Sequence, residues 1–288
     1  MTPRSAARSI YHWLYRLRVR LICYYSDHFQ SARGSGLNLP SAALRFKVSE
    51  SHSASEFLRI GRWCALLIEE RIRGACLDLE PGSRILDFGC GCGRTITWLM
   101  RDYPDAEFHG ADVDSEAIEW CRAHLPRGRF LVNAALPALP YPDGYFRIVY
   151  GLSVFTHLNE AMQDAWLPEL HRILEPGGLL LLTVHGRNAA RSLAADDLAT
   201  LKTVGFLHKT SNKLMGIVPD WYHTTWHSRD YATNRLARWF EHISYFEVSD
   251  GLQDFVIGRA KSSPGAWEAV HPQENVANRH PHIEQARE

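Results

Sequence analysis

Residues 84–93 read RILDFGCGCG, a short apolar run that passes directly into a turn with three glycines. A helical stretch follows over residues 94–102, so the glycine-rich turn joins a strand to a helix. The pattern repeats at residues 106–114, AEFHGADVD, which end in acids and precede a helix over Ser115–His124. Apolar strands that alternate with helices predict a parallel sheet with both faces covered.

Further strands follow the same rule. RFLVNA at 129–134, YFRIVYGL at 145–152 and LLLLTVHG at 179–186 are apolar runs, and a helix over 159–174 precedes the last of them. EHISYFEV at 241–248 and DFVIGRA at 254–260 are joined by a turn and predict an antiparallel edge. The predicted fold class is α/β: a Rossmann-like, doubly wound, mostly parallel seven-stranded sheet with an antiparallel edge, plus an N-terminal helical cap.

Three segments follow from these patterns. Residues 1–80 form an N-terminal helical extension or cap, in which Ser53 and Glu56 predict a capping box before a helix. Residues 81–261 form the α/β domain, with an insertion or substrate lid over 187–230. Residues 262–288 are polar and rich in turn formers, which predicts a disordered tail.

The N-terminal segment 8–25 allows two interpretations. Apolar residues recur at helical spacing (Ile10, Trp13, Leu14, Leu17 and Leu21), and residues 1–47 carry eight Lys or Arg against one acid. A peripheral membrane helix or a partner-docking helix would show this pattern. So would a helix that lies across the catalytic domain and covers a substrate pocket.

Composition narrows the class of protein. The chain of 288 residues has 32 Lys and Arg against 32 Asp and Glu, so it lacks the overall positive charge typical of nucleic-acid binding. Apolar residues make up 45% and charged residues 22%, as in globular proteins. The six cysteines are scattered, which predicts free thiols in the cytoplasm. Cys90 and Cys92 lack the four ligands that zinc prefers, so we expect no metal.

A ligand is expected where the strands end. In a sheet of this kind the ligand lies at the carboxyl ends of the strands, which places Asp87 and the three glycines at the centre. Asp112 ends the next strand, where a carboxylate accepts bonds from both hydroxyls of a ribose. The dinucleotide pattern G-x-G-x-x-G would need glycine at Arg94. A nicotinamide-dependent oxidoreductase is therefore the less favoured alternative.

Four segments together resemble the class I S-adenosylmethionine-dependent methyltransferases, of a small-molecule or glycan-pathway type. ILDFGCGCGR resembles the first motif of that family, and GADVDSEAI the acidic motif of its second strand. LPALPYPDGYFRIVY and LHRILEPGGLLLLTVHG resemble its later segments, in the expected order. The resemblance covers residues 83–186, and more loosely extends to 261. Arg147 departs from it, because the family often has aspartate there.

The resemblance implies S-adenosylmethionine as cofactor and assigns residues to it. Gly89, Gly91 and Gly93 would contact its methionine and ribose, Asp87 its amino group, and Asp112 its ribose hydroxyls. The adenine and flanking contacts would come from Asn133, Ala134 and Leu152.

The acceptor is expected to be a small molecule, a natural product or a sugar, methylated most readily at a hydroxyl. A hydroxyl needs a base, and His185, His223 and His157 are the candidates in that order. The segment DWYHTTWHS at 220–228 supplies expected substrate contacts from Tyr222, Trp226 and His227. Nucleic acid is not expected as a substrate. A catalytically inactive binding or scaffold subunit stays an alternative, because an intact cofactor motif does not establish catalysis.

Overall fold

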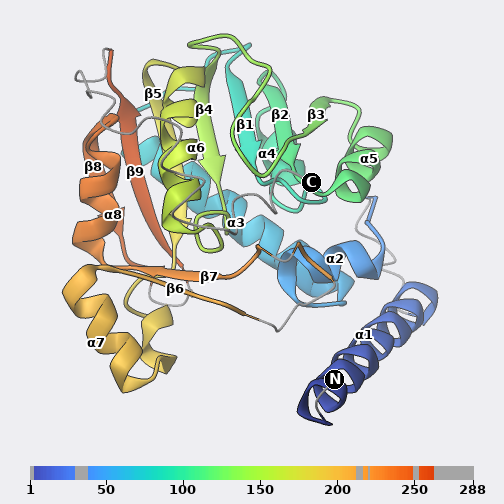
Figure 1. Cartoon of the computed structure of the whole chain (residues 1–288). Coiled ribbons are helices and arrows are strands. Elements are labelled where there is room, and N and C mark those ends of the chain that lie inside the picture. Colours follow the sequence, from blue (N-terminus) through green and yellow to red (C-terminus); the bar gives the residue numbers. More distant parts are fainter. Residues whose placement is uncertain (1–2, 30–37, 212–216, 220, 249–252, 263–288) are drawn as a thin grey trace.

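The computed structural model describes residues 3–29, 38–211, 217–219, 221–248 and 253–262. A single large sheet lies at the centre, with helices on both faces (Figure 1). None of the helices in these segments is long and apolar enough to cross a bilayer. Apart from Ser262, the predicted disordered tail lies outside the described residues.

The sheet has seven strands in the order β3-β2-β1-β4-β5-β9-β8. Their bounds are β1 Arg84–Phe88, β2 Glu107–Asp112, β3 Gly128–Val132, β4 Phe146–Gly151, β5 Leu174–Val184, β8 Phe240–Phe246 and β9 Asp254–Ala260. Strands β1 to β5 pair in parallel, with Leu86 opposite Val149. Strand β9 runs antiparallel to both β5 and β8. The predicted mostly parallel sheet with an antiparallel edge is confirmed, and its order reverses between β1 and β4, where such sheets bind ligands.

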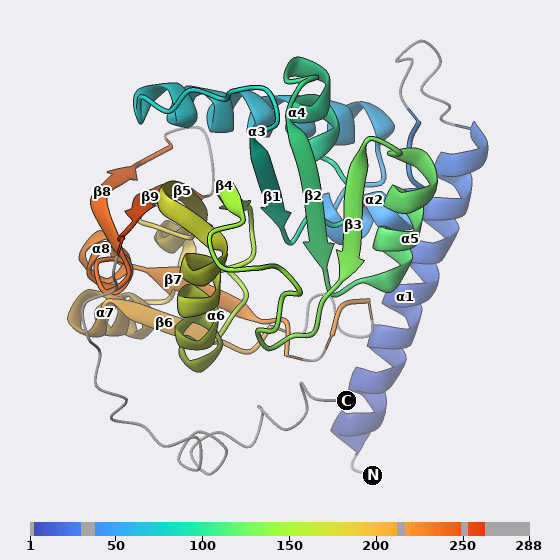
Figure 2. The same ribbon diagram turned by 90° about the horizontal axis from the view of Figure 1, so that it is seen from above.

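Both faces of the sheet are buried because successive strand residues point into different cores. The main covering helices are α3 Ala54–Gly74, α4 Ile96–Asp102, α5 Ser115–His124, α6 Glu160–Ile173 and α8 Arg229–Leu236. Ile85 and Ile148 pack with α3, α4 and α5. Leu86 and Val149 pack with α6 and α8 on the other face, and Figure 2 shows the two layers. Uninterrupted apolar strands therefore suit this fold.

The N-terminal segment forms helices, as predicted for the cap. Helix α1 spans Pro3–Phe29 and α2 spans Ala42–Ser49. Ser53 caps α3 by accepting a hydrogen bond from the Glu56 backbone N–H at 3.3 Å. The reciprocal half of the predicted capping box is replaced, because the Ser53 N–H donates to the Ser51 hydroxyl at 3.2 Å.

The insertion after β5 contains structure that the sequence pattern did not predict. A 3₁₀ turn (Ala189–Ser192) and helix α7 (Ala195–Val204) precede the antiparallel pair β6 (Phe206–Lys209) and β7 (Thr224–His227). Strand β7 reaches the main domain, since the Thr225 N–H donates to the Thr156 carbonyl at 2.8 Å. The insertion is therefore held against the segment that follows β4.

Candidate functional site

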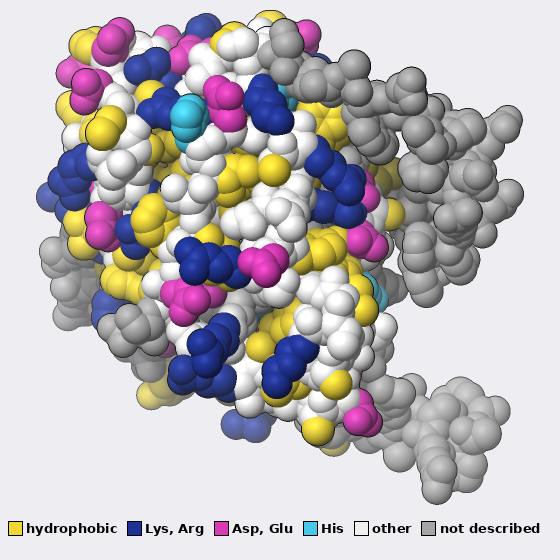
Figure 3. All heavy atoms as spheres, turned by 90° about the vertical axis from the view of Figure 1, so that its left-hand side faces the viewer, with side chains coloured by type: hydrophobic (Ala, Val, Ile, Leu, Met, Phe, Trp, Pro, Cys, Tyr) yellow, Lys and Arg dark blue, Asp and Glu magenta, His cyan; other side chains and the backbone are white. Residues whose placement is uncertain are grey.

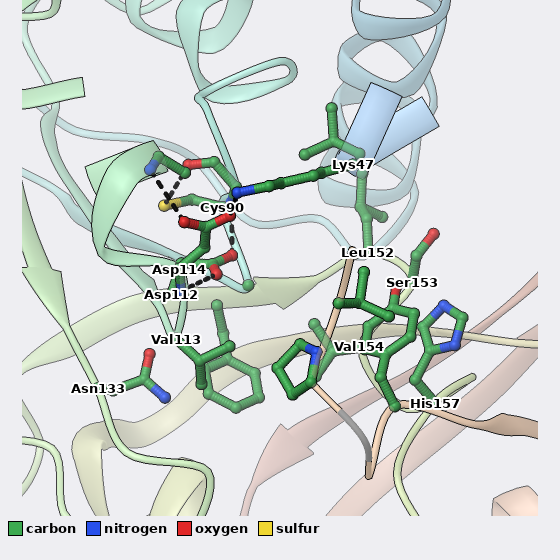
Figure 4. A pocket seen from close by; sticks show the side chains of 18 of the residues that line it. Lys47, Cys90, Asp112, Val113, Asp114, Asn133, Leu152, Ser153, Val154 and His157 are labelled. Carbon is green, nitrogen blue, oxygen red and sulfur yellow. Dashed lines mark hydrogen bonds and ion pairs between the residues drawn. The ribbon is translucent and has the colours of Figure 1, made fainter. Parts of the chain in front are cut away.

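A cavity of about 400 Å³ opens at the carboxyl ends of β1, β2 and β4. This volume falls within the range of roughly 300–1,000 Å³ typical of small-molecule sites. Its wall combines the β1–α4 turn, the end of β2, the segment after β4, helix α2 and residues 217–222 of the insertion, of which 220 is outside the described residues. Figure 4 shows Asp112, Asp114 and Asn133 on one side and Leu152, Val154 and His157 on the other.

The turn between β1 and α4 contains three glycines that pack closely against neighbouring side chains. Gly89 and Gly91 line the cavity at φ values of 79° and 51°, a left-handed conformation that favours glycine. A Cβ atom at Gly89 would lie 2.2 Å from Val154 Cγ2, and one at Gly91 would lie 2.4 Å from Val48 Cγ1. Gly93 does not line the cavity, and its Cβ would lie 2.6 Å from Leu125 Cδ1. Its place indicates helix packing rather than ligand contact.

Asp112 lies in the wall with both carboxylate oxygens oriented by the backbone. Oδ2 accepts from the Gly91 N–H at 2.7 Å, and Oδ1 accepts from the Asp114 N–H at 2.9 Å. Burial raises the pKa of Asp112, and these two N–H bonds oppose that rise. The carboxylate is thus held at the edge of the cavity in a fixed orientation.

Asp87 is a buried carboxyl at the end of β1. Burial raises its pKa to about 7, while the nearby Tyr150 hydroxyl acts in the opposite direction. Asp87 lines the cavity, so a cationic group bound there would stabilise its charged form.

Asn133 and Ala134 line the cavity just after β3. The Asn133 side-chain N–H donates to the Ala134 carbonyl at 2.7 Å. The Asn133 Oδ1 atom is buried and has no hydrogen-bond partner among the described residues. An unpartnered acceptor of this kind invites a donor from a ligand.

Helix α2 closes one side of the cavity through residues that sequence reasoning did not select. Leu44, Lys47 and Val48 line it, and the Lys47 ammonium lies 2.8 Å from Asp114 and 3.0 Å from Glu116. Burial would lower the pKa of Lys47, but these two carboxylates raise it above its ordinary value. In the sequence, only the excess of Lys and Arg over residues 1–47 pointed to this region. That excess does not indicate which acidic residue Lys47 would contact.

Two arginines depart from common patterns. Arg94, which stands where a dinucleotide site needs glycine, donates to the Val48 carbonyl at 2.9 Å and so holds α2 against the glycine turn. Arg147, at the start of β4, donates to the Asp78 carbonyl and pairs with Glu175 at 2.8 Å. It does not line the cavity, so its departure from the family pattern affects local packing only.

His157 and Tyr222 form the opposite wall. Their rings stack with centroids 3.8 Å apart. The Nδ1 atom of His157 lies 2.6 Å from the His223 carbonyl oxygen, so Nδ1–H donates and Nε2 carries the lone pair. Burial lowers the pKa of His157 to about 4, and burial raises the pKa of Tyr222. Both side chains are therefore neutral at pH 7.

The other predicted histidines lie outside the cavity lining. His185 faces β7, with Nδ1 3.1 Å from the Thr225 carbonyl oxygen. His227 is buried against Gln163, with Nε2 3.0 Å from its Oε1, and its pKa is lowered by burial to about 3. His223 contributes its carbonyl to His157, and Trp226 pairs with His185. Of the three predicted bases only His157 lines the cavity, although it was placed last.

Ser153 was also missed. It lines the cavity at φ 60°, a left-handed conformation that costs a non-glycine residue energy. Its N–H donates to Thr183 Oγ1 at 2.8 Å, and Thr183 in turn donates to Gln253 Oε1 at 2.7 Å. The Gln253 amide donates to Ser153 Oγ at 2.7 Å. This ring of bonds fixes the turn after β4 on which Leu152 and Val154 stand.

The described residues contain no group of three or more His, Cys, Asp or Glu side chains arranged to hold a metal ion. Cys90 and Cys92 are buried free thiols beside the glycine turn. Burial raises the pKa of each thiol, so neither is a ready thiolate.

Comparisons with known proteins agree with this geometry. Residues 85–178 match the methyltransferase domain family. The chain is 36% identical over 107 residues to the fatty-acid O-methyltransferase of Mycolicibacterium smegmatis, covering 37% of this chain and 38% of that protein. It is 31% identical over 139 residues to methyltransferase GfsG of Streptomyces halstedii, covering 45% and 46%. The chain thus spans less than half the length of these curated relatives.

A solved structure from Nostoc punctiforme superposes with a TM-score of 0.53 at 14% identity, over 75% of this chain and 60% of that one. This likeness concerns the fold. The matched segment 85–178 holds the glycine turn, Asp112 and Asn133, which line one cavity in the structure. Sequence match and cavity thus agree over residues 85–178, which are similar to the methyltransferase domain family.

Proposed function

We propose that this protein transfers the methyl group of S-adenosylmethionine to an oxygen atom of a small, largely apolar acceptor. One observation carries the proposal: a single cavity joins the Asp112 side to a neutral histidine, His157, that presents Nε2. The sulfonium of the cofactor supplies an activated methyl group, and the residues around it align the nucleophile with it.

The cofactor side fits the nucleoside. The Asn133 Oδ1 acceptor suits an adenine amino group, and Asp112 faces the cavity where ribose hydroxyls would donate. Gly89 and Gly91 line the cavity with backbone alone, and a Cβ atom on either would clash with Val154 or Val48. Asp87, with a pKa of about 7, would ionise when an ammonium group binds beside it.

The acceptor side is apolar and aromatic. It is lined by Val154, Leu158, Val218, Trp221 and Tyr222. Burial of hydrocarbon against these side chains would orient an acceptor, and few charges are present there to bind a strongly polar one. Among the small molecules expected from the sequence, an aromatic or aliphatic natural product fits this wall better than an unmodified sugar.

His157 is the proposed base for a hydroxyl acceptor. The bond from Nδ1–H to the His223 carbonyl fixes the ring, and Nε2 is left to take the hydroxyl proton. Its pKa of about 4 keeps it unprotonated at neutral pH. A positioned general base contributes roughly 10²–10⁴ in rate, and the lowered pKa of His157 favours the lower part of that range.

A carboxylate acceptor is the second candidate. The relative from Mycolicibacterium smegmatis is named a fatty-acid O-methyltransferase, and the apolar wall suits a hydrocarbon chain. A carboxylate is already ionised at neutral pH and needs no base. The two candidates therefore differ in their dependence on His157.

The test is methyl transfer from labelled S-adenosylmethionine to paired acceptors, an alcohol and the carboxylic acid of the same carbon skeleton. We expect His157→Gln to lower kcat for the alcohol by roughly 10²–10⁴ and to leave kcat for the acid nearly unchanged. His185→Gln is the matched control, because the His185 ring lies 6.3 Å from that of His157 but outside the cavity lining. Equal losses in both variants would remove His157 as base. Tight binding of S-adenosylmethionine without transfer to any oxygen acceptor would contradict the proposed reaction.

We also propose a cytoplasmic location. The six cysteines, Cys23, Cys64, Cys76, Cys90, Cys92 and Cys121, are free thiols in the structure. Thiols of this kind persist in reducing compartments. Labelling with a membrane-impermeant thiol reagent in intact cells, compared with lysed cells, tests this location.

A further inference from the structure

Helix α1 presents an apolar stripe to solvent. The stripe, called here the α1 stripe, consists of Trp13, Leu14, Leu17, Leu21 and Tyr24, whose exposed fractions run from 40% to 61%. At 3.6 residues per turn these positions share one side of the helix. Cys23 and Ser26 lie on the other side and are buried. The α1 stripe therefore faces away from the protein.

Helix α1 is fixed to the domain through its C-terminal end. The Asp27 carboxylate accepts the Ala42 N–H at 2.8 Å and 3.0 Å, which places it at the start of α2. The Ser26 hydroxyl donates to the His52 carbonyl at 2.9 Å. Figures 1 and 2 show the rest of α1 extending away from the sheet and its covering helices. These bonds fix which side of α1 faces outward.

Positive charge borders the α1 stripe. Arg16 and Arg20 lie along one edge of it and Arg18 along the other, by helical position. Asp27 is the one acid in α1, and its carboxylate is engaged by α2. By contrast, the face of the molecule in Figure 3 has positive and negative side chains interspersed.

We propose that the α1 stripe docks the protein on the surface of a membrane rich in anionic lipids. An apolar stripe with arginines on both edges lets a helix lie in the interface, with its apolar side among acyl chains and its guanidinium groups at phosphates. A second copy of the chain would bring like charges together along the same stripe, which disfavours self-association. The inference does not depend on the acceptor or on the proposed reaction.

Vesicle flotation of the full chain tests this proposal. The probes are vesicles of phosphatidylcholine alone and vesicles of equal parts phosphatidylcholine and phosphatidylglycerol. We expect the protein to float with the anionic vesicles only, and to be released when NaCl rises from about 0.1 M to about 0.5 M. The double variant Leu17→Glu/Leu21→Glu should lower partitioning at least about tenfold.

The matched control is Leu66→Glu on α3, because Leu66 is 44% exposed, as Leu17 is 40% exposed, but lies outside α1. We expect this control to float as the unaltered protein does, and all variants to keep the same melting temperature. Equal flotation of the control and the double variant would overturn the proposal. So would a dimer in solution that Leu17→Glu/Leu21→Glu dissociates while no form binds vesicles, since a second copy would then cover the α1 stripe.

Discussion

The two ends of the cavity are built in different ways. The proposed cofactor end is assembled from consecutive strand ends: Asp87 near the end of β1, Asp112 at the end of β2 and Asn133 just after β3. The acceptor end joins distant segments, since His157 bonds to a carbonyl 66 residues away at His223. Parallel pairing alone brings the first set together, whereas the second depends on how the insertion folds onto the domain. The proposed cofactor end is thus set by the parallel sheet, and the proposed acceptor end by long-range contacts of the insertion.

Replacing Asp112 by asparagine tests the cofactor end most strongly. The change keeps the shape but removes the charge from the proposed acceptor of the ribose hydroxyls. Hydrogen bonds to charged groups contribute about 1.5–3 kcal/mol, so we expect the Kd for S-adenosylmethionine to rise roughly 10–100-fold. Calorimetric titration measures this Kd.

The same variant sharpens the comparison between the ends. At saturating cofactor the KM for the acceptor should stay within about twofold of the unaltered value, because uniform loss of cofactor binding leaves the acceptor end in place. An unchanged Kd for S-adenosylmethionine would show that Asp112 lies outside the cofactor site. A large change in acceptor KM would show that the two ends are not separable.

Sequence reasoning selected residues that line the cavity at the proposed cofactor end because their signals are local. The helix predicted over Ser115–His124 has the bounds of α5, since Asp114 caps it through bonds to the Glu116 and Ala117 N–H groups. Glycines in a strand-to-helix turn and an acid at the next strand end are likewise patterns within a few residues. The parallel sheet then fixes where they meet.

The acceptor end was harder to predict because its contacts are long-range. Strand β6 has four residues and pairs with β7 across a long connection. A strand this short does not show an alternating apolar pattern long enough to predict it from sequence. That pairing covers His185 and leaves His157 at the cavity, so the candidate base that was placed last is the one that lines it. Lys47 was missed for the same reason, since its partner Asp114 lies 67 residues away.

The second prediction concerns pH at the cofactor end. Because burial raises the pKa of Asp87 to about 7, the ligand-free protein binds a proton there below that pH. An ammonium group stabilises the carboxylate, so bound cofactor lowers this pKa. Affinity for S-adenosylmethionine should therefore rise by up to tenfold per pH unit from about pH 5 to about pH 7. Titrations in buffers of different ionisation enthalpy should detect proton release.

Asp87→Asn supplies the control for this pH dependence. In this variant the affinity for S-adenosylmethionine should no longer rise between about pH 5 and about pH 7. Above about pH 7 the variant should bind the cofactor more weakly than the unaltered protein does. The raised pKa also means that the native state binds more protons than the unfolded state between about pH 4 and about pH 7, so this group lowers the free energy of unfolding as pH rises. The ligand-free Asp87→Asn protein should lack that decrease. An identical affinity slope in Asp87→Asn would assign the titration to another group.

The smallest effect is expected where α2 meets the cofactor end. Lys47→Met removes a partly exposed ion pair with Asp114 and Glu116, and such pairs contribute about 0–1 kcal/mol. We expect the Kd for S-adenosylmethionine to rise less than about fivefold in this variant. The difference in Kd between the variant and the unaltered protein should shrink as the salt concentration is raised. Lys209→Met, which removes a pair with Asp197 away from the cavity, is the matched control and should leave the Kd unchanged. If Lys47→Met weakened cofactor binding as much as Asp112→Asn does, the contrast between the two ends of the cavity would fail. Helix α2 would then belong to the cofactor end as fully as the strands do. Part of that end would lie outside residues 85–178, the segment that matches the family.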